Sequence, residues 1–88
     1  MALPSYTIKV ITPQGAAYTG EVTHSRIPVD GGCIGILANH APLVVSSAGG
    51  SLEVRDLKGK EKTYQVGPGF FEVSQNQAIF LTQSFENK

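Results

Sequence analysis

The positions of glycine and proline constrain what this chain can fold into more than any other feature. Ten glycines and five prolines are spread over 88 residues, and before residue 70 no segment free of both exceeds eight residues. A helix in a globular protein usually takes about 10–12 residues, and an interior glycine or proline costs it about 1 or 3 kcal/mol. Only the segment 70–88 is long enough for a helix, and its first half has the pattern of a strand. The spacing therefore predicts an almost entirely β protein.

The segments between these breaks alternate in the way expected of half-buried strands. Tyr6, Ile8 and Val10 fall on one face of a strand, and the polar residues between them fall on the other. Similar short segments follow about every 8–12 residues, which is typical of sandwiches and barrels. We predict one domain, residues 1–88, with an all-β fold: a two-sheet antiparallel β-sandwich or flattened barrel of roughly eight to ten short strands.

The same alternation predicts several local features. The segment 18–29 is expected to hold weaker strands broken at Gly20, the segment 57–60 to form a hairpin tip, and the polar residues after Thr82 to be a frayed end. The side chains predicted for the core share the inward face of their strands. They are Ile8, Val10, Ile36, Leu43, Leu52, Val54, Phe71, Val73 and Leu81.

Composition excludes several classes of protein. Seven basic and seven acidic residues give zero net charge, so the chain lacks the electrostatic character of a nucleic-acid-binding protein. No run approaches the ~20 apolar residues of a transmembrane helix, and the first five residues lack the basic end and apolar core of a secretory signal. The single cysteine, Cys33, cannot form an internal disulfide. These observations predict a small soluble domain in a reducing compartment.

Candidate catalytic residues are few. Cys33, His24 and His40 lack the spacing of metal ligands, and a free cysteine usually behaves as a small buried hydrophobe. The glycines at 31, 32 and 35 precede no helix, so a tight turn is favoured over a phosphate-binding loop. The residues therefore indicate no catalytic site, no metal site, no cofactor and no small-molecule substrate.

The residues alone leave other function classes open. Lys58 lies at the predicted hairpin tip, where lipoyl and biotinyl carrier domains of similar size present a modified lysine. Lysine is also ordinary on exposed turns, and a generic β-sandwich binding module needs no special residue there. In the segment His40-Ala41-Pro42, the histidine could pack in the core, face solvent or contact a partner.

Three segments of the chain carry a recognisable pattern. The most specific runs from Gly32 to Leu43 and ends in His-Ala-Pro-Leu; the others are Tyr18–Val22 and Gly69–Asn76. Together they resemble the amino-terminal β-sandwich domain of the epsilon subunit of F-type ATP synthase. The similarity extends over about residues 4 to 84, in the family's order and spacing.

The resemblance implies a non-catalytic subunit at the foot of the central stalk. Members of the family bind the gamma subunit, rest on the membrane-embedded c ring and help to couple proton-driven rotation to ATP synthesis. The residues that the resemblance assigns to the gamma contact are His40, Ala41, Pro42 and Val45. Those that it assigns to the c-ring contact are Asp30, Gly31, Gly32, Cys33 and Ile34. It also implies a peripheral location at the cytoplasmic face of the bacterial inner membrane.

Two departures from the family's pattern bear on these expectations. Asp30 is the only acidic residue in a loop that carries several in many relatives, so we expect the c-ring contact to depend weakly on salt. Many relatives also continue into a two-helix hairpin that can inhibit ATP hydrolysis, whereas this chain stops where the sandwich ends. Either the natural protein lacks the hairpin or the chain is a fragment; we expect the naturally short form, which couples rotation without that inhibition.

Overall fold

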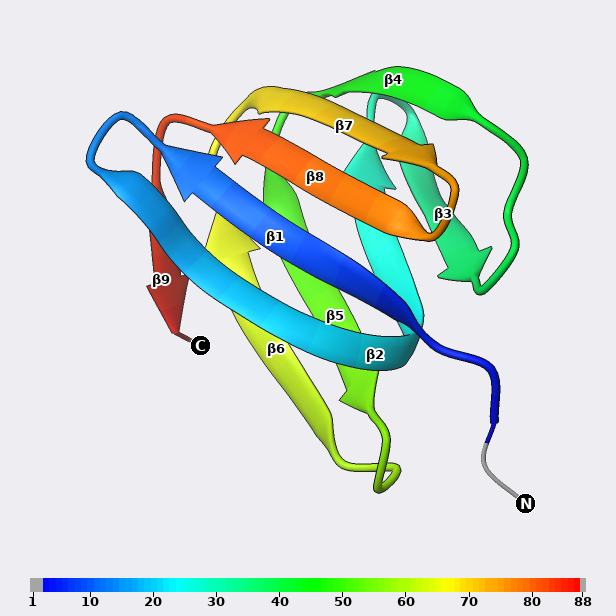
Figure 1. The fold of residues 1–88 in the computed structure, drawn as a ribbon. Coiled ribbons are helices and arrows are strands. Elements are labelled where there is room, and N and C mark those ends of the chain that lie inside the picture. Colours follow the sequence, from blue (N-terminus) through cyan, green and yellow to red (C-terminus); the bar gives the residue numbers. More distant parts are fainter. Residues whose placement is uncertain (1–2, 88) are drawn as a thin grey trace.

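The computed structural model describes residues 3–87, and every regular element within them is a β-strand (Figure 1). Nine strands lie within the predicted range of eight to ten, which confirms the all-β fold. They are β1 (Tyr6–Thr12), β2 (Gly15–Val29), β3 (Gly32–Leu37), β4 (Leu43–Ser47), β5 (Gly50–Asp56), β6 (Glu61–Val66), β7 (Gly69–Ser74), β8 (Gln77–Thr82) and β9 (Phe85–Asn87). In the part of the chain that is described, no helix has the length and apolar character to cross a bilayer.

The long strand β2 joins the two layers of the sandwich. Along one edge it pairs first with β1 and then with β3, and along the other edge it pairs with β5. Its pairing with β5 shifts register between Val22 and His24, and such an irregularity bends a strand. The first half of β2 therefore belongs to a first sheet, β4-β7-β8-β1-β2, and its second half to a second sheet, β3-β2-β5-β6-β9 (Figure 1).

One pair of strands departs from the predicted antiparallel arrangement. β1 and β8 run parallel, from Thr7 opposite Gln77 to Ile11 opposite Leu81. A parallel pair needs a long connection between its strands, and here all of β2 to β7 separates them. No pattern within either strand marks such a pairing, so it could not be read from the sequence.

The core fills the space between the sheets, and most of the predicted core residues are part of it. Its members are Tyr6, Ile8, Val10, Val22, Ile27, Ile36, Leu52, Val54, Tyr64, Val66, Phe71, Val73, Ala78 and Phe80. Leu43 is only half-buried against this cluster. The prediction for Leu81 is wrong: it is 45% exposed, because β8 turns Ala78 and Phe80 inward and the next residue points outward.

The expected break at Gly20 does not occur, and β2 is continuous from Gly15 to Val29. The ring of Tyr18 lies over Gly20 and covers the space that a side chain would fill. An aromatic ring in this position protects a glycine within a strand. The intrinsic weakness of the glycine is thereby offset.

The expectation of a frayed end after Thr82 is also wrong. β9 pairs antiparallel with β6, and Phe85 packs against the core. The ring centroid of Phe85 lies 4.8 Å from that of Tyr64 and 6.3 Å from that of Tyr18. The three aromatic rings hold this short strand on the second sheet. The polar sequence around Phe85 does not predict this long-range contact.

A buried polar contact joins three strands where β2 bends. Tyr6 is 1% exposed, and its hydroxyl oxygen lies 2.5 Å from the Ser25 hydroxyl oxygen and 3.0 Å from the carbonyl oxygen of Ile36, to which it donates. Desolvation by burial raises the pKa of Tyr6 to about 12, although the hydrogen bond with Ser25 opposes the shift. The contact links β1, β2 and β3 inside the apolar core.

Candidate partner-binding surface

The outer face of the first sheet carries large exposed apolar side chains. Val44 on β4 is 69% exposed and Phe70 on β7 is 58% exposed, and the outward Leu81 follows on β8. Phe70 lies opposite Leu81 on β8, and Leu81 in turn lies opposite Ile11 on β1. This cross-strand pairing brings the three side chains together. Together with the half-buried Ile11 and Ile79 on the same face, the exposed side chains form what we call the apolar face: Ile11, Val44, Phe70, Ile79 and Leu81.

The outer face of the second sheet carries two exposed ion pairs, and one large apolar side chain, Leu37 on β3, is 60% exposed there. The Nη2 atom of Arg55 lies 2.6 Å from Oε2 of Glu61, and Nη1 of Arg26 lies 3.8 Å from Oε2 of Glu53. Both pairs are exposed, so they contribute little to stability and suit a surface that stays in water. The first sheet exposes more neighbouring large apolar side chains than the second, and because contiguous exposed apolar surface is uncommon on a monomer, it is the candidate partner-binding side.

Two hollows adjoin the apolar face. One, of about 300 Å³, includes Ile11, Phe70 and Leu81 in its lining. The other, of about 230 Å³, is lined in part by Pro42 and Val44. Hollows beside exposed aromatic and aliphatic side chains are where a partner's side chains can insert.

The loop between β3 and β4 carries most of the residues assigned to the gamma contact. His40 is half-buried, Ala41 and Pro42 are exposed, and Pro42 lines the smaller hollow. Val45 is half-buried and packs against the core, whereas the neighbouring Val44 points outward. The loop and the apolar face are therefore continuous through Pro42 and Val44.

Two asparagines anchor this loop to the turn between β7 and β8. The backbone N–H of Asn39 donates to Oδ1 of Asn76 at 2.6 Å, and Nδ2 of Asn76 donates to Oδ1 of Asn39 at 3.1 Å. Both residues have positive φ, 65° and 60°, a conformation that asparagine tolerates better than most residues. Two of the three segments that carried the resemblance thus meet here.

The turn assigned to the c-ring contact lies beside β4. Oδ2 of Asp30 accepts a hydrogen bond from the Ser46 hydroxyl at 2.5 Å, and the N–H of Asp30 donates to the carbonyl of Ser46 at 3.2 Å. Gly31, with φ of 87°, supplies the left-handed backbone of the turn. Cys33 is exposed at the start of β3, which corrects the expectation of a small buried hydrophobe, while Ile34 is half-buried.

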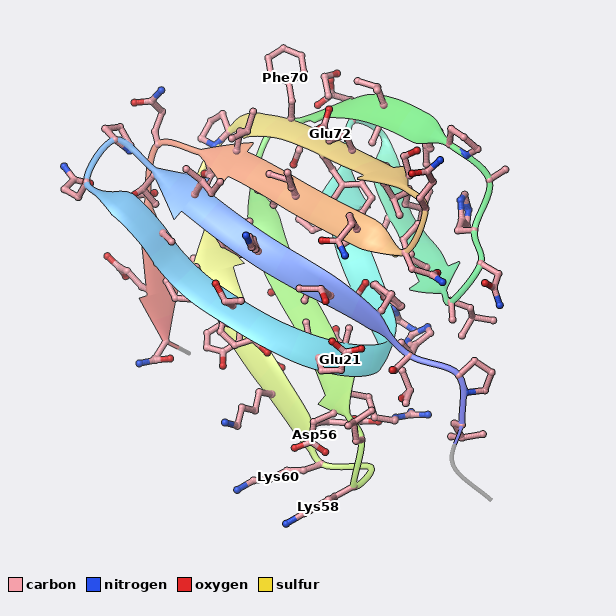
Figure 2. The ribbon with its side chains drawn as sticks, viewed as in Figure 1. Glu21, Asp56, Lys58, Lys60, Phe70 and Glu72 are labelled. Carbon is pink, nitrogen blue, oxygen red and sulfur yellow. The ribbon has the colours of Figure 1, made fainter. Side chains whose placement is uncertain are left out.

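Lys58 lies in the turn between β5 and β6, as the sequence predicts for a hairpin tip. Oδ1 of Asp56 accepts the backbone N–H groups of Lys58 and Lys60, each at 2.9 Å. These hydrogen bonds, that of Lys60 above all, lower the pKa of the Asp56 carboxyl. Figure 2 shows both lysines projecting from this tip, far from Phe70 and Glu72. Among residues 3–87, no three histidine, cysteine or acidic side chains lie together as metal ligands would.

Sequence reasoning missed Val44, Phe70 and Leu81 as surface residues. A signal was present, because each belongs to a run of consecutive apolar residues: 43–45, 70–71 and 78–81. A strand with one face in water alternates, whereas a strand that is apolar on both faces is covered on both. Such runs in the strands of a small sandwich are a signal that its outer face can also be covered.

Comparison with known proteins gives a consistent result. The chain matches the family model described as "ATP synthase, Delta/Epsilon chain, beta-sandwich domain" over residues 5–88. It is 35% identical over 79 residues to the ATP synthase epsilon chain of Chlorobaculum tepidum, covering 90% of each chain. It is 43% identical over 76 residues to the ATP synthase epsilon chain of Leptospira borgpetersenii, covering 85% of this chain and 58% of that relative.

Solved structures share the fold at low sequence identity. A chain of the Euglena gracilis mitochondrial ATP synthase (OSCP/F1/c-ring) superposes with a TM-score of 0.86 at 23% identity, covering 99% of this chain and 56% of that one. A chain from the central stalk and c-ring of the Tetrahymena thermophila mitochondrial ATP synthase superposes with a TM-score of 0.77 at 12% identity, covering 99% and 69%. These likenesses show the β-sandwich fold.

Proposed function

The chain belongs to the ATP synthase delta/epsilon chain β-sandwich family, and from this membership we propose that it links the gamma subunit to the c ring and couples rotation of the ring to ATP synthesis. As a member of this family it is a non-catalytic component of ATP synthase rather than an enzyme. Its location is peripheral, at the membrane that holds the complex. We place it at the cytoplasmic face of a bacterial inner membrane.

The observation that carries the proposal is the apolar face of the first sheet. A monomer that exposes Val44 and Phe70 to this extent gains by covering them, at roughly 25 cal/mol for each Å² of apolar surface removed from water. Gamma is the occupant proposed for this face. His40, Ala41 and Pro42 extend the contact along the adjoining loop, and Val45 supports it from beneath by packing against the core.

The c-ring contact is proposed for the turn of Asp30, Gly31, Gly32, Cys33 and Ile34. This turn is hydrogen-bonded to Ser46, which pairs with Phe70 across β4 and β7, so the two proposed contacts adjoin. Adjoining contacts on one close-packed body suit a part that transmits torque, because packed sheets yield little under load. The hydrogen bond to Ser46 also restrains the only carboxylate of the turn.

Binding to purified gamma subunit tests the first contact. We expect Phe70→Ser to weaken binding at least tenfold, because it removes an exposed anchor of the apolar face. Leu57→Ser is the matched control, since Leu57 is equally exposed, at 58%, but lies in the β5–β6 hairpin. Equal binding by both variants and the unaltered chain would overturn the gamma assignment. Recovery of dehydrogenase or carboxylase components from native membranes, in place of gamma and c subunits, would favour the carrier function instead.

Cross-linking through Cys33 tests the second contact. Its thiol is exposed, so a short bifunctional reagent can attach to it in the intact ATP synthase without any substitution. We expect the cross-linked product to contain the c subunit, with little dependence of yield on salt because only one acid lies in the turn. A thiol that reacts with a small maleimide but never captures the c subunit would refute this placement.

A further inference from the structure

Glu72 is an isolated carboxylate within the apolar face. It projects from β7 on the same side as Phe70, and cross-strand pairing places it between Val44 on β4 and Ile79 on β8. Figure 2 shows Phe70 and Glu72 along the same strand, at the end of the molecule away from Lys58 and Lys60 in the β5–β6 hairpin. A charge in this position is surrounded by side chains that a partner is expected to cover.

Among residues 3–87, no cation forms an ion pair with Glu72. Strands β4, β7 and β8 contain no lysine, arginine or histidine. By register, the nearest cation on this face is Lys9 on β1, which lies opposite Ile79. Lys9 is therefore two strands away from Glu72, about 10 Å at the usual ~4.8 Å strand spacing. Within the described residues, both ion pairs lie on the second sheet and neither includes Glu72.

Docking of a partner changes the surroundings of this carboxylate. A purely apolar partner surface would strip water from Glu72 without compensation, and an unpaired buried carboxylate is strongly unfavourable. A partner that brings a cation avoids this penalty and gains a charge-assisted hydrogen bond. Arginine fits best, because its planar group can pair with the carboxylate and also lie against the ring of Phe70, two residues away on the same face.

We infer that Glu72 determines the specificity of the apolar face: it takes an arginine or lysine from the gamma subunit, so the complementary surface is apolar with one cation facing Glu72. This inference rests on the proposed function, in which gamma occupies the face. Apolar surfaces without that cation are disfavoured, because docking them would leave the Glu72 carboxylate buried and unpaired.

The test measures the dissociation constant for purified gamma subunit with Glu72→Gln, which keeps the shape and removes the charge. If gamma supplies a cation, this variant binds about 30-fold more weakly or worse, because the cation is left unpaired. The unaltered chain should also lose affinity as salt rises, and the variant less so. If gamma supplies none, Glu72→Gln binds equally well or more tightly, because a costly desolvation is gone. Either of these results overturns the inference.

Two controls separate the possible failures. Glu86→Gln removes an exposed carboxylate on β9, at the edge of the second sheet, and should leave gamma binding unchanged. If Phe70→Ser has no effect on gamma binding, the proposed function fails; if it weakens binding while Glu72→Gln does not, only the present inference fails. Thermal unfolding of Glu72→Gln should match that of the unaltered chain, because the carboxylate is exposed and makes no contact that stabilises the isolated fold.

Discussion

Replacing Tyr6 by phenylalanine tests how much the buried hydroxyl contributes to the sandwich. The substitution keeps the ring in the core and removes the hydroxyl that bonds to Ser25 and to the carbonyl of Ile36. Ser25 is fully buried, so its hydroxyl loses a partner that water cannot replace. A buried polar group left unsatisfied costs about 1–3 kcal/mol. We expect the free energy of unfolding at pH 7 to fall by about 2 kcal/mol, or the Tm by about 8–16 °C for a domain of this size.

A double-mutant cycle, measured by urea denaturation, isolates the contribution of the hydrogen bond between Tyr6 and Ser25. Ser25→Ala alone should also destabilise, because it leaves the tyrosine hydroxyl with one partner fewer. Tyr6→Phe combined with Ser25→Ala should cost clearly less than the sum of the two, because the second change removes the group that the first left unsatisfied. If Tyr6→Phe costs less than about 0.5 kcal/mol, or if the two costs simply add, the hydrogen bond is not what stabilises this part of the core.

The pH dependence provides an independent measurement of the same group. A tyrosine in the unfolded chain loses its proton near pH 10, whereas burial raises the pKa of Tyr6 to about 12 in the folded state. The unfolded state therefore releases its proton first, so the contribution of Tyr6 is intact below pH 10 and is lost as the pH rises toward 12, by up to about 2 kcal/mol. Tyr6→Phe should flatten this decline, leaving only the smaller contributions of Tyr18 and Tyr64, whose pKa values burial also raises. An unchanged slope would contradict the argument.

Three further substitutions can be followed by urea denaturation. Gly69→Ala should cost at least about 3 kcal/mol, because a Cβ at this position would overlap a backbone carbonyl oxygen of β8, which has little room to move. Asn76→Ala should cost about 1–2 kcal/mol and speed hydrogen exchange in the loop 38–42, since Asn39 loses both of its bonds to the turn; Asn76→Gly, which tolerates the positive φ, should speed exchange as much at lower cost. Phe71→Ala should cost about 3–5 kcal/mol and Phe70→Ala less than about 0.5 kcal/mol, although the two rings are adjacent in sequence, because only the first is buried. Equal costs for the two phenylalanines would contradict the assignment of inner and outer faces.

The sequence by itself was sufficient for the class of fold and for most of the core. Glycine and proline break the chain too often for helices, and the period-two alternation of β1, β5 and β7 correctly separates Ile8, Leu52 and Phe71 from their outward neighbours. These are local properties: they depend on the allowed backbone conformations of each residue and on the pleat of a single strand. Three short segments, of which the one ending in His-Ala-Pro-Leu is the most specific, together also indicated the family.

Only the tertiary structure decided which apolar residues face outward where several follow one another. In the run 78–81, local pattern leaves the inward positions open, and it is the pairing of β8 with β7 and β1 that turns Phe80 inward and exposes Leu81. The candidate site depends on the same choice, because Val44 and not Val45 joins the apolar face.

Contacts between distant segments were equally beyond local reasoning. Asn39 and Asn76 are 37 residues apart, and Phe85 finds its aromatic neighbours only because β9 returns to β6. The bend of β2 near Thr23, which divides one hydrogen-bonded path into two sheets, likewise arises from its pairing with three other strands. Each of these features follows from the packing of the whole chain, since a strand's own residues specify its pleat but not the strands beside it.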